Sequence, residues 1–290
     1  IASAGGVTGT ALAKKYNFSN STTDHKEILS DVDVDLAMIT TRHDKHAQMV
    51  VEALNAGKHV FVEKPLALNA EQLKLIIDAY KSPLRMGSLT VGFNRRFSPH
   101  AVKVKKLIGT STINVIATMN AGFLPENSWV HDMATGGGRI IGEACHFIDL
   151  ISYFTGCKVK SVCMNAMENN PQANTDNGSI LLKYTNGSTG VINYFSNGAK
   201  SYAKERVEIY SQERTAVINN FKITEGYGFK GFSKLRTGLD KGHKSQFKQL
   251  ISMVKNGGAP LIPFDELINT TKASFAAIES LKSGGWVDVS

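Results

Sequence analysis

The sequence has no long apolar run and no closely spaced cysteine pair, and each absence excludes a class of protein. A transmembrane helix needs about 20 consecutive apolar residues, and no stretch of the chain approaches that length. Cys145, Cys157 and Cys163 are odd in number and form no Cys-x-x-Cys motif. We therefore expect reduced thiols, no disulfide framework, no metal site and a cytoplasmic protein.

The first residues also lack a secretion signal. The stretch from Ile1 to Gly6 contains no basic residue and no long apolar run, whereas a signal peptide has both. The chain does not begin with methionine, which favours the interpretation that it is part of a longer protein.

Composition is ordinary apart from a basic charge balance. The 290 residues are 42% hydrophobic and 20% charged, as in soluble globular proteins, and their number exceeds one typical core, which predicts two domains. The net charge of +8 suits an anionic ligand or a nucleic acid. Because the lysines and arginines are spread along the chain, we interpret them as a solvated surface and expect no nucleic-acid partner.

Strand and helix patterns alternate with short links through residue 93. This alternation predicts a parallel sheet with helices on both faces, and we assign residues 1–93 to the first domain. Strands are expected at 1–3, 34–39, 58–62 and 86–93, and helices at 7–18, after a capping box at 24–27, at 44–55, and from a cap at 69–72 to residue 81.

After residue 93 the pattern changes to strands separated by turn signals. This predicts a second, α+β domain, residues 94–290, with a mostly antiparallel sheet and helices on one side. A long polar loop is expected at 122–138. Helices are expected at 98–108, 140–154, 244–255 and 265–282, and strands at 113–121, 158–167, 178–184, 188–195, 205–210 and 215–219.

The stretch Phe61-Val62-Glu63-Lys64-Pro65 is the centre of the predicted site. It reads as the buried end of a strand, and ligands of open α/β sheets lie at the carboxyl ends of the strands. Lys64 is a movable proton donor that Glu63 could orient, and Pro65 stiffens the turn. A cis Lys64–Pro65 bond is one hypothesis for this turn. The alternative is an ordinary polar strand exit.

Three glycines, Gly136 to Gly138, precede a helix whose polar residues share one face. Glu143, His146 and Asp149 recur at helical spacing. Histidine accepts and donates a proton near neutral pH, and Glu143 could hold its tautomer. The alternative is a core histidine with satisfied hydrogen bonds.

Two further motifs suggest ligand contacts less strongly. Arg95 and Arg96 follow a strand, where guanidinium groups suit phosphate or carboxylate, unless they are a surface basic pair. Residues 226–231 match G-x-G-x-x-G, but no helical pattern follows, so we reject a dinucleotide loop there and expect a glycine-rich loop.

Taken in order, these motifs resemble the Gfo/Idh/MocA family of oxidoreductases, which includes glucose-fructose oxidoreductase and inositol 2-dehydrogenase. The resemblance implies an N-terminal Rossmann domain and a C-terminal domain that carries a sugar site. The form of residues 136–149 is similar to a subgroup often fused behind a zinc-type alcohol dehydrogenase domain. The motifs are Thr40-Thr41 with His43 and His46, Glu63-Lys64-Pro65, Asn94-Arg95-Arg96-Phe97, and the glycines leading to His146 and Asp149.

The resemblance implies an NAD- or NADP-dependent enzyme that transfers a hydride between the nicotinamide and a hydroxyl of a sugar or sugar derivative. Lys64 would hydrogen-bond the substrate near the reacting carbon, and His146 would be the acid/base. The protein would form a homo-oligomer. Cofactor contacts would come from Ser3, Thr40, Thr41, His43, His46, Glu63 and Lys64, and substrate contacts from Asn94, Arg95, Arg96, Glu143 and Asp149.

The sequence departs from the family pattern at two places. The family has an aspartate four residues before the histidine, where this chain has Gly142, so either Glu143 has taken that role or His146 works alone. The family's first strand and phosphate-binding glycine loop do not precede Ile1, and Ser3 stands where an acidic residue would bind the ribose of NAD, which favours NADP. A non-catalytic ligand sensor or regulator on the same fold is therefore the alternative function.

Overall fold

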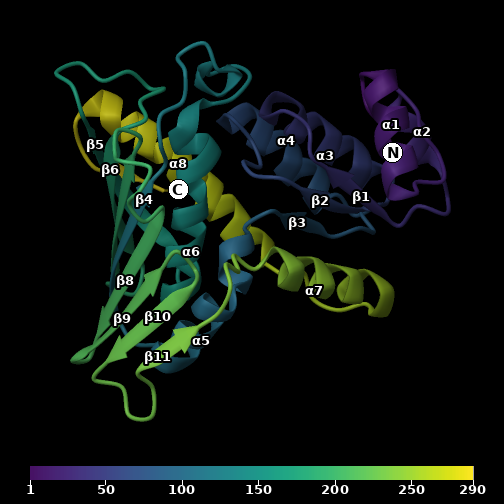
Figure 1. Ribbon diagram of the computed structural model, residues 1–290. Helices are drawn as coiled ribbons and strands as arrows, with labels where there is room; N and C mark the ends of the chain where they lie inside the picture. Colours follow the sequence, from purple (N-terminus) through teal and green to yellow (C-terminus); the bar gives the residue numbers. More distant parts are fainter. Residues whose placement is uncertain (290) are drawn as a thin grey trace.

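This computed structural model describes residues 1–289, which form two sheets and the helices that pack on them (Figure 1). The parallel sheet has the strand order β1-β2-β3, and the large sheet has the order β11-β10-β9-β8-β4-β7-β6-β5-β12. In Figure 1 the large sheet lies on the left, the parallel sheet lies on the right, and helices lie between them. The predicted fold class, a Rossmann-like parallel unit joined to a mostly antiparallel α+β unit, is confirmed.

Alternate residues of β2 pack against helices on opposite faces of the parallel sheet. Val60 and Val62 belong to one core cluster with residues of α3 and α4. Phe61, between them, packs against Phe247 and Leu250 of α7, from the far end of the chain. The elements are β1 (Leu36–Ile39), α3 (His46–Asn55), β2 (His59–Val62), α4 (Ala70–Lys81), β3 (Leu89–Val91) and α7 (His243–Asn256).

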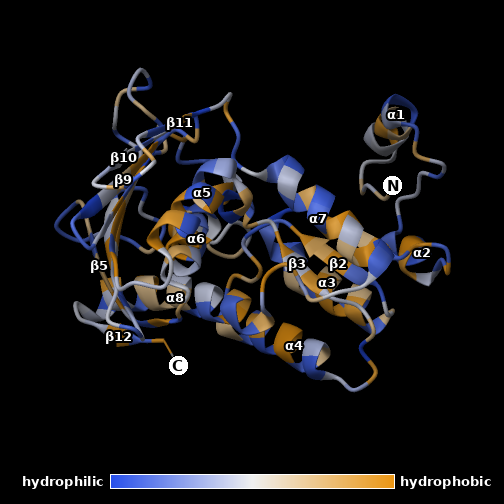
Figure 2. Ribbon diagram, turned by 90° about the horizontal axis from the view of Figure 1, so that it is seen from below, coloured by the Kyte–Doolittle hydropathy of each residue, from blue (hydrophilic) through white to orange (hydrophobic). Residues whose placement is uncertain are grey.

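The first residues differ from the prediction. Ala2 forms one parallel bridge with Thr22 and does not join the parallel sheet, so the strand expected at 1–3 is wrong. An isolated bridge forms because the partner segment is itself a loop. Figure 2 shows α1 (Gly6–Tyr16) standing apart from the body of the protein, followed by α2 (His25–Ser30).

The large sheet carries helices on one face, as predicted. Its strands pair antiparallel except for β4 and β7, which are parallel. Val115, Ile148 and Ala277 belong to the core between this sheet and its helices. The strands are β4 (Asn114–Asn120), β5 (Val159–Ala166), β6 (Gly178–Tyr184), β7 (Thr189–Phe195), β8 (Glu205–Ser211), β9 (Arg214–Asn219), β10 (Ile223–Tyr227), β11 (Lys234–Arg236) and β12 (Val287–Asp288), and the helices are α5 (Pro99–Ile108), α6 (Cys145–Thr155) and α8 (Phe264–Ser283).

Three of these strands, β10, β11 and β12, are absent from the prediction. The segment read as a glycine-rich loop begins inside β10, where a side chain on Gly226 would lie 2.5 Å from the ring of Phe232. Glycine is needed there for close packing, and its weak strand propensity hid the strand. No helix follows this segment, because the next element is β11.

Short irregular helices adjoin the sheet edges. The helix predicted from residue 140 begins with a π-helical turn, η4 (Ile140–Ala144), before α6. The other short helices are η1 (His43–Lys45), η2 (Asn94–Phe97) and η3 (Trp129–His131). No helix within residues 1–289 is long and apolar enough to cross a membrane.

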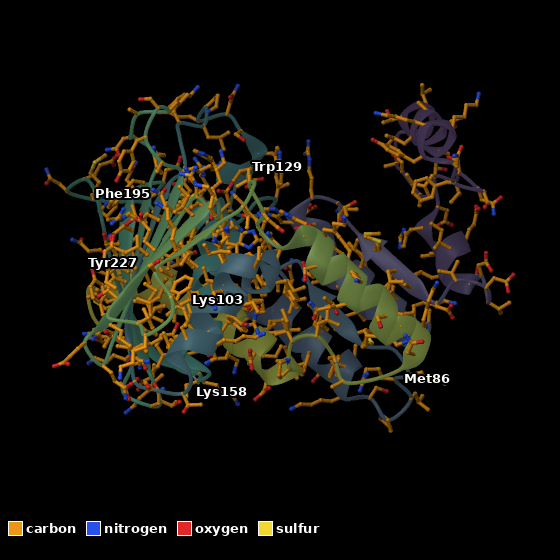
Figure 3. All side chains as sticks on the ribbon, turned by 60° about the horizontal axis from the view of Figure 1, so that its bottom comes forward. Met86, Lys103, Trp129, Lys158, Phe195 and Tyr227 are labelled. Carbon is orange, nitrogen blue, oxygen red and sulfur yellow. The ribbon has the colours of Figure 1, made fainter. Side chains whose placement is uncertain are left out.

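The outer face of the large sheet carries exposed aromatic side chains. Figure 3 labels Phe195 and Tyr227 on this side of the molecule, and they are 36% and 57% exposed.

Two predictions about the whole protein are not tested by this structure. They are the homo-oligomer and the domain boundary at residue 93.

Candidate active site

The ends of the three parallel strands meet at one edge. Glu63, after β2, donates its backbone N–H to the carbonyl of Ile39 at the end of β1, at 2.9 Å. The Lys64–Pro65 bond that follows is cis, as hypothesised. The Glu63 carboxylate lies against Gly92, after β3, where a Cβ would be 2.8 Å from Oε2. Gly92 therefore leaves the space that this carboxylate occupies.

His46 connects two of these strand ends. Its Nδ1 lies 2.7 Å from the carbonyl oxygen of Pro65, and its Nε2 lies 3.1 Å from that of Thr41. The side chain is fully buried, and burial lowers its pKa. A neutral imidazole has one N–H, so one of the two carbonyls accepts it at a time. The ring thus fixes the turn that carries Lys64.

Lys64 reaches across to the helix that carries His146. Its Nζ donates to the carbonyl oxygen of Gly142 at 2.9 Å. Gly142 lies in η4, four residues before His146 in the first turn of α6. The structure therefore brings together the two residues that the sequence predicted as catalytic, one from the turn after β2 and the other from α6.

His146 is buried and incompletely hydrogen-bonded. It is 8% exposed and lies edge-on to Phe93, with ring centroids 6.2 Å apart. Its Nδ1 has no hydrogen-bond partner among residues 1–289. Burial, and then the positive charges of Arg95 and Lys64, lower the pKa of His146 well below its ordinary value. The imidazole is neutral at pH 7 and can accept a proton.

Glu143 is held by other partners than predicted. The Tyr194 hydroxyl donates to its carboxylate, and Nη2 of Arg139 lies 3.4 Å away. Burial would raise the pKa of Glu143, but Tyr194, Arg139 and Lys64 outweigh it and keep the pKa below its usual value. No hydrogen bond joins Glu143 to His146 in the described part of the chain, so the prediction that Glu143 holds the His146 tautomer is wrong.

The predicted substrate-binding arginines are already paired. Arg96 contacts Asp149 through Nε and Nη2, at 3.0 and 2.6 Å, and Nη1 reaches Glu266 at 2.9 Å. Arg95 contacts Glu205 through Nε and Nη2, at 2.8 and 3.0 Å. Their role in binding a substrate, and that of Asp149, stays a prediction.

Asn94 belongs to the same connecting segment. Its amide donates to the backbone carbonyl of Lys241 at 2.7 Å, and the Lys241 ammonium contacts Glu205. The segment between β3 and α5 is therefore bound to the segment that leads into α7. A substrate contact of Asn94 stays a prediction.

The predicted cofactor residues divide into two groups. Thr40 and Thr41 are exposed at the end of β1, beside the buried His43. Nδ1 of His43 lies 2.7 Å from the carbonyl oxygen of Gly136, and its ring lies edge-on to Trp129. Ser3 instead bonds Thr22 near α1, and no hydrogen bond connects it to the other predicted cofactor residues within residues 1–289.

Two contacting residues, Tyr194 and Trp129, were not among the site residues predicted from the sequence. Tyr194 lies on an inward position of β7, and nothing local marks it as a partner of Glu143. Trp129 lies in the long loop 122–138, whose length was itself a signal, because structureless loops of that length are often functional. Figure 3 shows Trp129 at the junction of the two halves of the molecule.

This edge fits a nicotinamide cofactor. Exposed hydroxyls of Thr40 and Thr41 and the carboxylate of Glu63 can hold ribose hydroxyls. His146 supplies a buried, neutral imidazole beside the Lys64 ammonium. A proton acceptor next to a cation, at the carboxyl ends of parallel strands, suits oxidation of an alcohol.

Two family models match most of the chain. Residues 1–93 match the oxidoreductase family with an NAD-binding Rossmann fold, and residues 105–217 match the GFO/IDH/MocA C-terminal domain.

The chain is also similar to individual proteins. It is 30% identical to the uncharacterized oxidoreductase YrbE of Bacillus subtilis over 222 residues, which are 73% of this chain and 63% of that relative. It is 24% identical to the myo-inositol 2-dehydrogenase of Thermotoga maritima over 93% of this chain and 84% of that relative. The structure of levoglucosan dehydrogenase with NADH and levoglucosan superimposes with a TM-score of 0.85 at 24% identity, covering 100% of this chain and 89% of that one. At that identity, the last match shows the fold alone.

Proposed function

The chain belongs to the Gfo/Idh/MocA family of oxidoreductases with an NAD-binding Rossmann fold, and we propose that it is a nicotinamide-dependent dehydrogenase of a sugar or related polyol. The observation that carries this proposal is the position of Lys64. Its ammonium donates a hydrogen bond to the carbonyl oxygen of Gly142, which precedes the neutral His146 by one helical turn. The relatives' names support the substrate class, because they include dehydrogenases of inositol and levoglucosan.

Residues at the strand ends would hold the cofactor. Thr40, Thr41 and Glu63 would bind its ribose, and the family description names NAD. The preference for NADP inferred from Ser3 stays a prediction. When bound, the nicotinamide supplies the hydride acceptor.

Lys64 would bind and polarise the reacting hydroxyl. An ammonium has three N–H donors. Within the described residues, 1–289, one of them is used on Gly142, which leaves two for a ligand. A donor aimed at the alcohol oxygen stabilises the negative charge that develops there as the proton leaves.

His146 would accept that proton. A general base must be unprotonated at working pH and within hydrogen-bond reach of the hydroxyl. Burial keeps the pKa of His146 below its ordinary value, so the ring is neutral. Burial also excludes water, which strengthens the interaction of Lys64 with a charged oxygen. Glu143, held by Tyr194 and Arg139, adds a fixed negative charge near the ammonium.

The test is turnover with a defined panel. The protein is mixed with NAD⁺ or NADP⁺ and with myo-inositol, levoglucosan or glucose, and the absorbance of reduced nicotinamide is followed. We expect activity with at least one polyol. The substitution Lys64→Met should lower kcat/KM by about 10²- to 10³-fold, the usual effect of removing one hydrogen-bond donor from a developing negative charge.

The matched control is Lys74→Met, which removes an exposed lysine of α4 that pairs with Asp78. This control should keep full activity. Cofactor binding without turnover of any polyol would instead support the sensor function, and full activity in Lys64→Met would refute the assigned role of Lys64.

A further inference from the structure

The ring of His43 occupies the space beside Gly142. His43 belongs to η1, after β1, and Gly142 belongs to η4, so the two residues come from the two halves of the chain. A Cβ placed on Gly142 would lie 3.2 Å from Cε1 and 3.5 Å from Nδ1 of His43. The φ angle of Gly142 is not positive, so the backbone conformation does not require glycine. The position of the imidazole therefore explains the glycine.

Three contacts hold the imidazole of His43 in this position. Its Nδ1 lies 2.7 Å from the carbonyl oxygen of Gly136. Its ring centroid lies 4.9 Å from that of Trp129 and 5.6 Å from that of His46. The residue is 9% exposed, so the ring cannot turn away without breaking these contacts. A side chain at position 142 would have to displace a ring that is held on several sides.

The contact with Gly136 determines which nitrogen of His43 is free. A carbonyl oxygen only accepts hydrogen bonds, so Nδ1 carries the proton. Burial lowers the pKa of His43 to about 4, so near pH 7 the ring is neutral and Nε2 has a lone pair. Nε2 has no hydrogen-bond partner among residues 1–289, and it is not one of the enclosed polar atoms that lack a partner. It is therefore open to a ligand.

This free acceptor lies beside the Lys64 ammonium. Nζ of Lys64 donates to the carbonyl oxygen of Gly142 at 2.9 Å, so the lysine and His43 contact the same residue of η4. The positive charge of Lys64 acts on the His43 ring. His146 follows four residues after Gly142, in the first turn of α6. A ligand bound at Lys64 thus meets a donor from the lysine and an acceptor from His43.

We propose that His43 is a further substrate-binding residue, whose Nε2 accepts a hydrogen bond from a hydroxyl next to the reacting one. The proposal rests on the proposed function, because it takes the reacting hydroxyl to be the one that Lys64 binds. The substrate class that this pair selects is a cyclic polyol with hydroxyls on adjacent carbons. One oxygen receives the Lys64 donor, and the neighbouring hydroxyl donates to His43.

The missing aspartate at position 142 leaves two candidates for an acceptor. Glu143 receives the Tyr194 hydroxyl and lies 3.4 Å from Nη2 of Arg139, so its carboxylate is engaged. His43 fills the space that a side chain at position 142 would enter, and its Nε2 is free. The histidine therefore suits this role better than the glutamate does.

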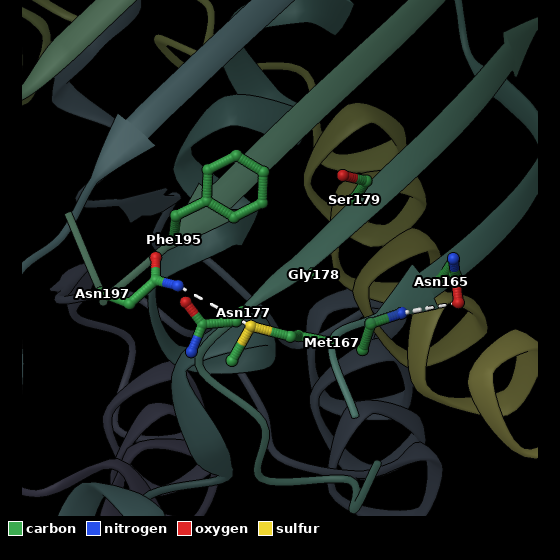
Figure 4. A pocket seen from close by; sticks show the side chains of 8 residues that line it. Asn165, Met167, Asn177, Gly178, Ser179, Phe195 and Asn197 are labelled. Atoms are coloured by element: carbon green, nitrogen blue, oxygen red, sulfur yellow. Dashed lines mark hydrogen bonds between the residues drawn. The ribbon is translucent and has the colours of Figure 1, made fainter. Parts of the chain in front are cut away.

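The hollow where β5 and β7 end is a separate surface. It has a volume of about 340 Å³, and Figure 4 shows Asn165, Ser179 and Phe195 around it. Neither His43 nor Gly142 lines this hollow. The Ser179 hydroxyl donates to Asn193 at 2.9 Å. Ser179 therefore offers a control position on another part of the protein.

Two substitutions separate substrate binding from structural support. His43→Asn keeps an N–H at the place of Nδ1 and removes the acceptor at Nε2. His43→Gln puts an amide oxygen near the place of Nε2 and removes the donor to Gly136. We expect kcat/KM for the polyol to fall about tenfold in His43→Asn and less in His43→Gln, because only the first loses the substrate hydrogen bond. The KM for the nicotinamide should not change, and Ser179→Ala should keep wild-type kinetics.

The opposite pattern would overturn the proposal. Full activity in His43→Asn with a loss in His43→Gln would show that the ring only supports Gly136. A raised KM for the nicotinamide with an unchanged KM for the polyol would assign His43 to the cofactor instead.

A binding measurement keeps the test independent of turnover. The whole protein, labelled with ¹⁵N at histidine, is observed by NMR with NADH, and myo-inositol, levoglucosan or glucose is then added. The reduced cofactor cannot oxidise the alcohol. We expect one of these polyols to shift the Nε2 resonance of His43, which is assigned by its loss in His43→Asn. A shift in a protein that turns over no polyol would refute the dehydrogenase function and leave the binding role intact. A resonance that no polyol moves would overturn the proposal.

Discussion

Two groups of titratable residues lie close together and differ in how completely they are paired. The paired cluster consists of Arg95, Arg96, Asp149, Glu205 and Glu266, and each guanidinium in it makes a two-point contact with a carboxylate. The open cluster consists of Lys64, Glu143 and His146. In it, among residues 1–289, the ammonium uses one donor and Nδ1 of the imidazole has no hydrogen-bond partner.

The difference separates residues whose charges stabilise the fold from residues that are free to bind or react with a ligand. A complete buried ion pair contributes little net stability, but removal of one partner leaves an uncompensated charge and costs several kcal/mol. Groups with free donors or acceptors are costly to bury and cluster at functional sites. Substitutions in the paired cluster should therefore change stability, and those in the open cluster should change activity.

The largest effect is expected from His146→Gln. The amide keeps some hydrogen-bonding capacity but cannot take up a proton, so kcat/KM should fall by about 10²- to 10⁴-fold. The control is His100→Gln, at a buried histidine whose nitrogens are both partnered, by Thr224 at 2.7 Å and Thr237 at 2.8 Å. Steady-state kinetics on both variants check this. Equal loss of activity in the two would remove the distinction between a free and a satisfied histidine.

Arg96→Met should break the paired cluster. It leaves Asp149, which is 1% exposed, without its cation, and the free energy of unfolding should fall by about 3–5 kcal/mol. The matched control is Arg206→Met, because Arg206 pairs with Glu208 and its side chain is 40% exposed. An exposed pair contributes about 0–1 kcal/mol. Urea unfolding followed by circular dichroism measures both, and a similar loss in the two would contradict the argument.

Tyr194→Phe sharpens the comparison within the open cluster. It removes the hydroxyl that donates to Glu143 and leaves the ring in place. A hydrogen bond to a charged group contributes about 1.5–3 kcal/mol, so the unfolding free energy should fall by about 2 kcal/mol. Tyr184→Phe is the control, because its hydroxyl contacts Ser152 at 3.4 Å and no carboxylate. An unchanged midpoint in Tyr194→Phe would show that the Glu143 contact adds no stability.

A pH titration tests the neutral histidines of the site. Burial lowers the pKa of His43 from 6.5 to about 4. Because the unfolded chain binds a proton below pH 6.5 and the folded ring does not, stability is retained above 6.5 and is lost as the pH falls toward 4. The loss from this group is on the order of 3 kcal/mol. His43→Phe should flatten the stability curve in this window, and an equal slope in both proteins would show that the ring does not titrate there.

Local signals predicted many elements accurately. Asn69 caps α4 through Gln72 at 2.9 Å, as its position before the helical pattern indicated. Asp24 likewise accepts from the N–H of Lys26 at the start of α2. The expected capping box is incomplete, however, because the N–H of Asp24 goes to Thr22 and not to Glu27. Alternating apolar residues placed β6 at residues 178–184. Such features depend on neighbours within a few positions, so the sequence alone reveals them.

Long-range partners could not be read in the same way. Arg95 and Glu205 are 110 positions apart, and Glu143 and Tyr194 are 51 apart. From the sequence, Arg95 and Arg96 were interpreted as ligand-binding residues or as a basic pair on the surface. The structure instead buries both guanidiniums against carboxylates. α7 was predicted as a helix, yet its contact with Phe61 depends on how the two halves of the chain pack.

The sequence by itself determined which residues can move protons and at which strand end they stand, because strand ends, caps and helix faces follow from residue type at short spacing. The tertiary structure decided which of those residues are free to act. It paired Arg95, Arg96 and Asp149 inside the core and left Lys64 and His146 with unused hydrogen-bonding capacity. The physical reason is that a buried charge is stable only with a partner, and that partner is selected by packing between segments distant in the chain.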